Sequence, residues 1–102
     1  MGFIEIIKSI FGSSPKVDFS ELIHKGALVL DVRTKGEFQS GHLKGSVNIP
    51  LNNLASSLSK IKNNRAIITC CASGARSSSA RSILMSNGFN EVYNGGRWNS
   101  LR

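Results

Sequence analysis

The stretch at residues 67–85, IITCCASGARSSSARSILM, decides the fold of this chain. An apolar, β-branched run ends in two cysteines, a turn of small residues follows, and apolar residues then recur at the spacing of a helix. The pattern predicts a strand that ends at Cys71 and, after a tight loop, a helix from Ala75 to Met85. In sheets built from such units, ligands bind in the loops that follow the carboxyl ends of the strands.

Predicted strands and helices alternate along the rest of the chain. The expected strands are residues 27–32, 46–50, 65–71 and 91–93. The expected helices begin at the capping boxes of Asp18 with Glu21 and Thr34 with Glu37, at Leu51, and at Ala75. This alternation predicts an α/β fold with a small, mainly parallel sheet flanked by helices on both faces.

The length of 102 residues is enough for one domain, which we expect to cover residues 15–102. Residues 1–14 form an N-terminal extension whose apolar residues fall near helical spacing, which predicts a short amphipathic helix. Packing of that helix on the domain is favoured over contact with a membrane. Charges interrupt the apolar run and no cleavage site follows, so a secretory signal is not expected. No stretch reaches the ~20 apolar residues of a membrane span.

The chain is basic, with 13 Lys and Arg against 6 Asp and Glu and a net charge of +7. The resulting positive field favours anionic partners. The basic residues are scattered and aromatic residues are few, so nucleic acid is not an expected partner. The adjacent Cys70 and Cys71 form neither a disulfide framework nor the C-x-x-C of a zinc site. We therefore expect reduced thiols, a cytoplasmic location and no metal.

The loop after the strand has the composition of an anion site. The small side chains of Ala72, Ser73, Gly74 and Ala75 allow successive N–H groups to point into one concavity, and the N-terminus of a helix adds further donors.

A sulfur in that concavity is favoured as the thiolate, so the pKa of Cys71 falls, and the guanidinium of Arg76 acts in the same direction. Cys71 as a small buried hydrophobe in a glycine turn is the alternative, and the spacing leaves both open. Alternation along the strand turns Cys70 to the opposite face, where we expect a core residue rather than a redox role.

Two stretches carry a resemblance: LVLDVRTKGEFQSGHLKGSVNIP at 28–50 and IITCCASGARSSSARSILMSNGFNEVYNGGRWNSL at 67–101. Together they resemble the rhodanese, or sulfurtransferase, domain family, and within it the small single-domain members of the phage-shock protein E type. The signature D-V-R…E-F…G-H-x-x-G-S-x-N-I-P and the loop C-x-x-G-x-R-S occur in the order of that family. The resemblance implies a rhodanese-like, three-layer α/β fold.

The resemblance also implies an activity. Cys71 would be the nucleophile that carries sulfane sulfur, in a cradle made of Ala72, Ser73, Gly74, Ala75 and Arg76. The thiolate would take the outer sulfur of a small anionic donor such as thiosulfate and pass it to a thiol or a protein cysteine. No metal or organic cofactor takes part, and we expect a monomer.

Two other functions are weighed against this one. A persulfide carrier or interaction module would hand sulfur to one protein partner and turn over poorly alone. Related phosphatase and arsenate reductase domains have a loop one residue longer, C-x5-R, whereas Cys71 and Arg76 make C-x4-R, the length for sulfur transfer.

The other signature residues are expected to be structural. Asp31, Arg33 and Glu37 are predicted to form a polar network, and His42 to be a structural histidine. Trp98 is expected to pack on the domain, with contact to the acceptor as the alternative. Gly95 and Gly96 are expected to form a turn with positive φ. Cys70 stands where many relatives have a larger residue, and Ala72 where a basic residue is frequent, so low activity on thiosulfate is compatible with the sequence.

Overall fold

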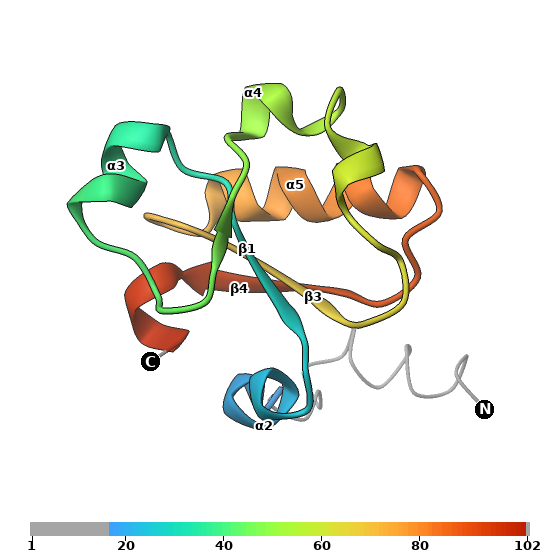
Figure 1. The fold of residues 1–102 in the computed structure, drawn as a ribbon, viewed down its shortest axis with the longest axis horizontal. Coiled ribbons are helices and arrows are strands. Elements are labelled where there is room, and N and C mark those ends of the chain that lie inside the picture. Colours follow the sequence, from blue (N-terminus) through green and yellow to red (C-terminus); the bar gives the residue numbers. More distant parts are fainter. Residues whose placement is uncertain (1–16, 102) are drawn as a thin grey trace, which may run out of the picture.

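The computed structural model of the chain describes residues 17–101. The predicted N-terminal helix lies outside these residues, and the division of the chain after residue 14 stays a prediction. Four strands, all parallel, form one sheet in the order β2-β1-β3-β4 (Figure 1). The strands are β1 (Leu28–Asp31), β2 (Val47–Asn48), β3 (Ile67–Cys71) and β4 (Val92–Arg97).

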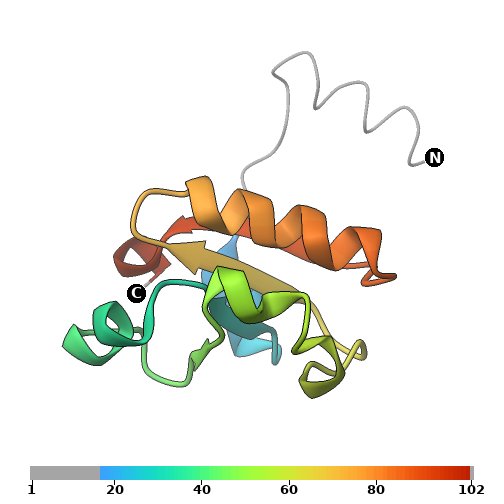
Figure 2. The same cartoon turned by 90° about the horizontal axis from the view of Figure 1, so that it is seen from above.

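Helices cover both faces of this sheet, which confirms the predicted three-layer α/β architecture. The α-helices are α2 (Phe19–His24), α3 (Lys35–Ser40), α4 (Leu51–Leu54) and α5 (Ala75–Ser86), and two 3-10 helices are η2 (Leu58–Lys60) and η3 (Trp98–Leu101). In Figure 1, α4 and α5 lie above the sheet while α2 and η3 lie below it. Viewed from above, α5 runs along β3 (Figure 2).

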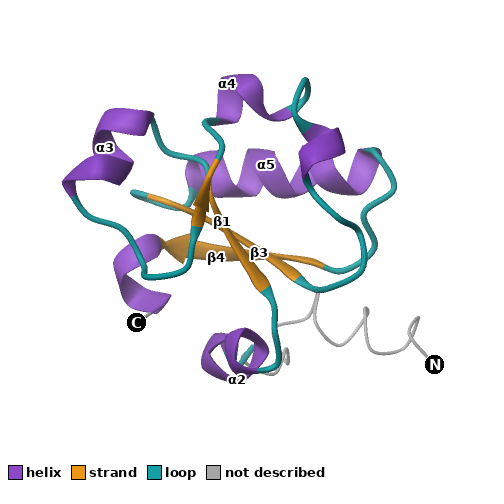
Figure 3. Ribbon diagram, viewed as in Figure 1, coloured by secondary structure: helices purple, strands orange, loops and turns teal. Residues whose placement is uncertain are grey.

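The two faces of the sheet bury separate apolar clusters. Figure 3 shows the strands lying between the helices that cover these faces. Cys71 lies in the cluster beneath α4 and α5, together with Leu84. Cys70 lies in the cluster on the other face, together with Val29 and Leu101. Side chains alternate along a strand, so neighbouring cysteines point in opposite directions. The predicted separation of the two thiols is confirmed.

The caps of the short helices follow the sequence closely. The Oγ1 of Thr34 accepts the amide of Glu37 at 3.2 Å, and the Glu37 carboxylate accepts the amide of Thr34 at 3.0 Å, so this capping box is complete. Asp18 accepts the amide of Glu21 at 3.0 Å, while the Glu21 carboxylate lies 3.2 Å from the Lys25 ammonium. Only the Asp18 half of the first predicted box is therefore formed.

One predicted helix and one predicted turn differ from the structure. The single helix expected from Leu51 divides into α4 and η2, because two Asn residues in α4 and two Ser residues after it stabilise a helix poorly. The turn expected at Gly95 and Gly96 lies inside β4, and only Gly96 has a positive φ, of 73°. A Cβ on Gly95 would lie 2.6 Å from the Cγ2 of Ile68, so the glycine permits close packing of β4 on β3.

Candidate active site

The candidate site is the loop between β3 and α5. Gly74 is the N-cap of α5 and adopts a left-handed conformation with φ 105°, which glycine allows at little cost. This turn aims amides at the thiol: the Gly74 N–H donates to the Cys71 Sγ at 3.0 Å, and the Ser77 N–H donates to it at 3.4 Å. The concavity expected from the sequence is present, and the sulfur lies at its centre.

The predicted cradle residues contribute unequally. Gly74 donates directly to the sulfur, whereas the Ala75 N–H points to the Ser73 Oγ at 3.5 Å. Ala72, Ser73 and Ala75 are exposed and form the outer surface of the loop. The sulfur is therefore held mainly by Gly74 and by the first turn of α5.

Burial and hydrogen bonding have opposite effects on the pKa of Cys71. Burial raises the pKa, but the hydrogen bond between Cys71 and the Ser77 side chain and those from the backbone of Ser77, Gly74 and Ser73 together outweigh burial and lower it to about 7. A thiol with this pKa is a thiolate in a large fraction of molecules at neutral pH. The thiol of Cys70 differs, because burial raises its pKa to about 12.

The loop closes over the sulfur that it holds. Cys71 is 0% exposed, so the thiol does not line an open pocket in this state. The exposed residues of the loop carry side chains no larger than serine. A donor therefore reaches the sulfur only when the groups around it move aside, and contacts of the Asn94 side chain with Gly74 and Ser77 restrain that movement.

Two residues outside the predicted set complete the site. The Ser77 Oγ lies 3.5 Å from the Cys71 Sγ and donates to the Asn94 Oδ1 at 2.6 Å. The Asn94 Nδ2 in turn lies 3.4 Å from the Gly74 carbonyl oxygen, so this side chain ties β4 to the last residue of the loop and to the first turn of α5. Ser77 belongs to the quoted loop motif and sits in the first turn of α5, which is a local signal. Nothing local marks Asn94, which comes from another strand.

Arg76 forms an ion pair with a residue of another helix. Its guanidinium pairs with the carboxylate of Glu37 on α3, with Nη1–Oε1 2.7 Å and Nη2–Oε2 3.0 Å. The hydrogen bond from Arg76 is the main cause that lowers the pKa of Glu37 to about 2, followed by the bond from the Thr34 backbone. The positive charge of Arg76, which was expected to favour the thiolate, is therefore neutralised by the Glu37 carboxylate. The hydrogen bonds to the Cys71 sulfur come from the loop and from α5.

The remaining signature residues form the structural network that the sequence predicts. Asp31 and Arg33 make a buried ion pair, with Nη2–Oδ2 2.7 Å. The Arg33 guanidinium also lies over the Trp98 ring, 4.6 Å from its centroid. His42 stacks on Phe38 with ring centroids 3.7 Å apart, and its Nδ1 lies 2.8 Å from the Phe38 carbonyl oxygen. These contacts hold α3 and η3 beside the loop.

Known proteins are similar to this chain in sequence. A family model described as rhodanese-like domain matches residues 16–96. The thiosulfate sulfurtransferase GlpE of Pseudomonas savastanoi is 31% identical over 83 residues, which cover 81% of this chain and 78% of the relative. The Bacillus subtilis protein YqhL is 35% identical over 71 residues, 70% of this chain and 56% of YqhL.

Solved structures agree with the sequence comparisons. A human single-domain sulfurtransferase superposes with a TM-score of 0.75 at 26% identity, covering 84% of this chain and 93% of that one. Within residues 17–101, no helix has the length and apolar character needed to cross a membrane.

Proposed function

The chain belongs to the rhodanese-like domain family, and we propose that it moves sulfane sulfur from a small anionic donor, such as thiosulfate, to a thiol acceptor through a persulfide on Cys71. The observation that carries this proposal is the pair of N–H groups, from Gly74 and Ser77, that point at the Cys71 Sγ. They stabilise the negative charge on that sulfur before transfer, and in the persulfide they lie beside the outer sulfur that then carries the charge.

The proposed reaction has two displacements at sulfur. The Cys71 thiolate attacks the outer sulfur of thiosulfate, the S–S bond of the donor breaks, and sulfite leaves with the electron pair. The outer sulfur, now bound to the Sγ, carries the negative charge. A thiolate of the acceptor then attacks this outer sulfur and becomes a persulfide, and Cys71 returns as the thiolate. Neither step needs an external base, because the loop already lowers the pKa of Cys71 to about 7.

Intact-mass analysis after incubation with thiosulfate tests the proposal. The native protein is expected to gain the mass of one sulfur atom, and cyanide is expected to remove it. Cys70→Ser is the matched control, because Cys70 lies on the other face of the sheet, and it should gain the same mass. Cys71→Ser should gain none. A gain that survives in Cys71→Ser would refute the role of this residue.

A persulfide carrier with little turnover of its own is the second candidate function. The observation that favours it is the closed loop, which leaves Cys71 with 0% exposure. A partner that opens the loop would then control the release of sulfur. Stoichiometric loading without sustained turnover of cyanide would support the carrier, whereas turnover with cyanide alone would support the enzyme.

A further inference from the structure

Three hollows adjoin along the edge of the sheet that β2 forms. Their volumes are about 670, 550 and 330 Å³. The two larger ones share Asn48, Pro50 and Asn53 as lining residues, and the two smaller ones share Pro50. The hollows therefore make one continuous depression, which we call the β2 groove.

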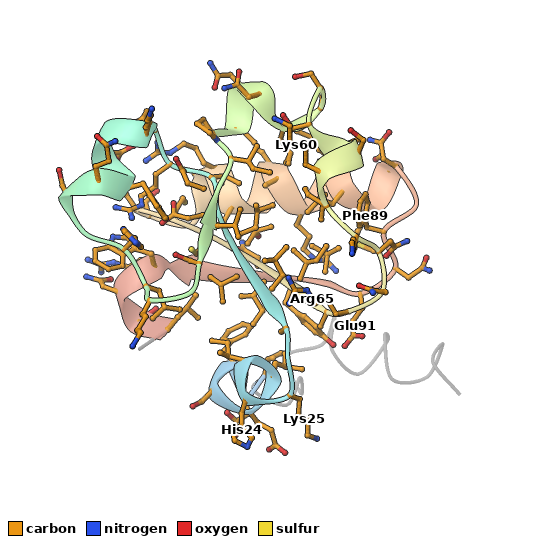
Figure 4. The ribbon with its side chains drawn as sticks, in the orientation of Figure 1. His24, Lys25, Lys60, Arg65, Phe89 and Glu91 are labelled. Carbon is orange, nitrogen blue, oxygen red and sulfur yellow. The ribbon has the colours of Figure 1, made fainter. Side chains whose placement is uncertain are left out.

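The charges along the β2 groove have one sign. Its basic lining residues are Lys35, Lys60, Lys62, Arg65 and Arg76, and no Asp or Glu lines any of the three hollows. Lys60 lies near α4 and Arg65 near the start of β3 (Figure 4), so the cations border the largest hollow along its length. Among the described acidic residues, Glu37 pairs with Arg76 and so neutralises the cation at the smallest hollow, while Lys35, Lys60, Lys62 and Arg65 keep their charge. The other acidic residues are engaged elsewhere: Asp18, Glu21, Asp31 and Glu91. The β2 groove therefore attracts anionic ligands.

The surface between these cations is partly apolar. Val47 on β2 is 43% exposed and lines the largest hollow together with Ile49 and Pro50. Apolar contact area bordered by charges is typical of a site for a protein segment. A nucleic acid backbone would use the cations and leave these apolar side chains without contacts.

The groove ends beside the catalytic loop. Arg76 lines the smallest hollow together with Val32 and Leu51. The next residue along α5 is Ser77, whose amide donates to the Cys71 Sγ. A chain lying in the groove therefore has its end within reach of the loop that covers the reactive sulfur.

From this geometry we propose that the β2 groove docks an acidic segment of the protein whose thiol accepts sulfur from Cys71. The inference rests on the proposed function for the identity of the thiol, because sulfur transfer requires an acceptor thiol at the loop. The groove supplies the recognition: its cations select acidic side chains, and its apolar floor holds the segment in place.

Transfer to a synthetic peptide tests the proposal. The probe has one cysteine next to a run of glutamates and leucines, and the reference peptide carries glutamines in place of the glutamates. The thiosulfate-loaded protein is mixed with each peptide, and the loss of sulfur is followed by intact mass. Lys60→Gln with Lys62→Gln should slow transfer to the acidic peptide about fivefold and weaken its dependence on salt. Transfer to the glutamine peptide and to 2-mercaptoethanol should not change.

A matched pair separates the groove from the general field of the protein. Lys25 and Lys44 are exposed, line none of the three hollows, and carry the same charge as Lys60 and Lys62. Lys25→Gln with Lys44→Gln should leave transfer to the acidic peptide within about twofold of the native rate. Equal slowing by the two double variants, or equal rates for the two peptides on the native protein, would overturn the proposal.

A binding assay in which no sulfur is transferred tests the β2 groove independently of the proposed function. Fluorescence anisotropy of the labelled acidic peptide, with its cysteine replaced by serine, is measured on Cys71→Ser. Weaker binding after the Lys60 and Lys62 changes would support the groove even if no persulfide forms in the mass experiment. Displacement of the peptide by single-stranded DNA at lower concentration than by unlabelled peptide would assign the groove to nucleic acid and overturn the proposal.

Discussion

The guanidinium of Arg76 and the carboxylate of Glu37 form a two-point ion pair, with N–O distances of 2.7 and 3.0 Å, between α5 and α3. The pair joins the residue that directly follows the loop to the first turn of α3. Because the two charges cancel, Arg76 attracts an anionic donor less strongly than its position directly after the loop implies.

Breaking the ion pair between Arg76 and Glu37 should improve binding of an anionic donor. Glu37→Gln leaves Arg76 with an uncompensated charge, and glutamine still serves the capping box with Thr34. We expect the KM for thiosulfate to fall about threefold, with kcat within about twofold of the native value. Steady-state assays with cyanide as acceptor measure both. Glu91→Gln removes the same charge from an exposed position on the Val92 side of the sheet and should leave KM unchanged.

The rate of persulfide formation should follow the ionisation of Cys71. The thiolate is the nucleophile and its pKa is lowered to about 7, so the rate should fall as the pH decreases below 7 and reach a plateau above it. Initial rates of loading with thiosulfate between about pH 5 and pH 9 measure this profile. An inflection near 9, the ordinary value for a thiol, would show that the loop does not activate the sulfur.

The hydroxyl of Ser77 should account for part of that lowered pKa. Ser77→Ala removes the side-chain hydrogen bond to Cys71 and retains the amide that also donates to the sulfur. We expect the inflection of the loading profile to move about one unit higher. Ser78→Ala is the matched control, because Ser78 is the exposed neighbour on the same helix. An unchanged inflection in Ser77→Ala would assign the effect to the amides alone.

The close packing of β4 on β3 should depend on glycine at position 95, which has no side chain. A Cβ there would lie 2.6 Å from the Ile68 Cγ2 and 2.9 Å from the Thr69 carbonyl oxygen, so one of the strands has to shift. Gly95→Ala should lower the free energy of unfolding by about 2 kcal/mol, measured by urea denaturation.

Gly36 provides the comparison for that substitution. It lies in α3, and a Cβ there meets no heavy atom within 4 Å. Gly36→Ala should therefore raise the free energy of unfolding by up to about 1 kcal/mol. Equal effects at the two glycines would contradict the packing argument.

Local patterns in the sequence were enough to predict the architecture and the position of the proposed nucleophile at the end of β3. Alternation of strand and helix patterns predicts the parallel sheet, and the box of Thr34 with Glu37 predicts the start of α3. The run of small residues after Cys71 predicts amides that point at the sulfur. Each of these features depends on residues a few positions apart, whose geometry the backbone itself restricts.

The tertiary structure alone decided how the site is completed. Asn94 joins Ser77 across 17 positions, and Arg76 meets Glu37 across 39 positions of the chain. The burial of Cys71 likewise depends on packing. Contacts between distant segments form only when the layers of the fold assemble. The hydrophobic periodicity of one segment does not indicate which residue of another segment it will contact. Sequence therefore placed the sulfur, and packing set the charges and the closure around it.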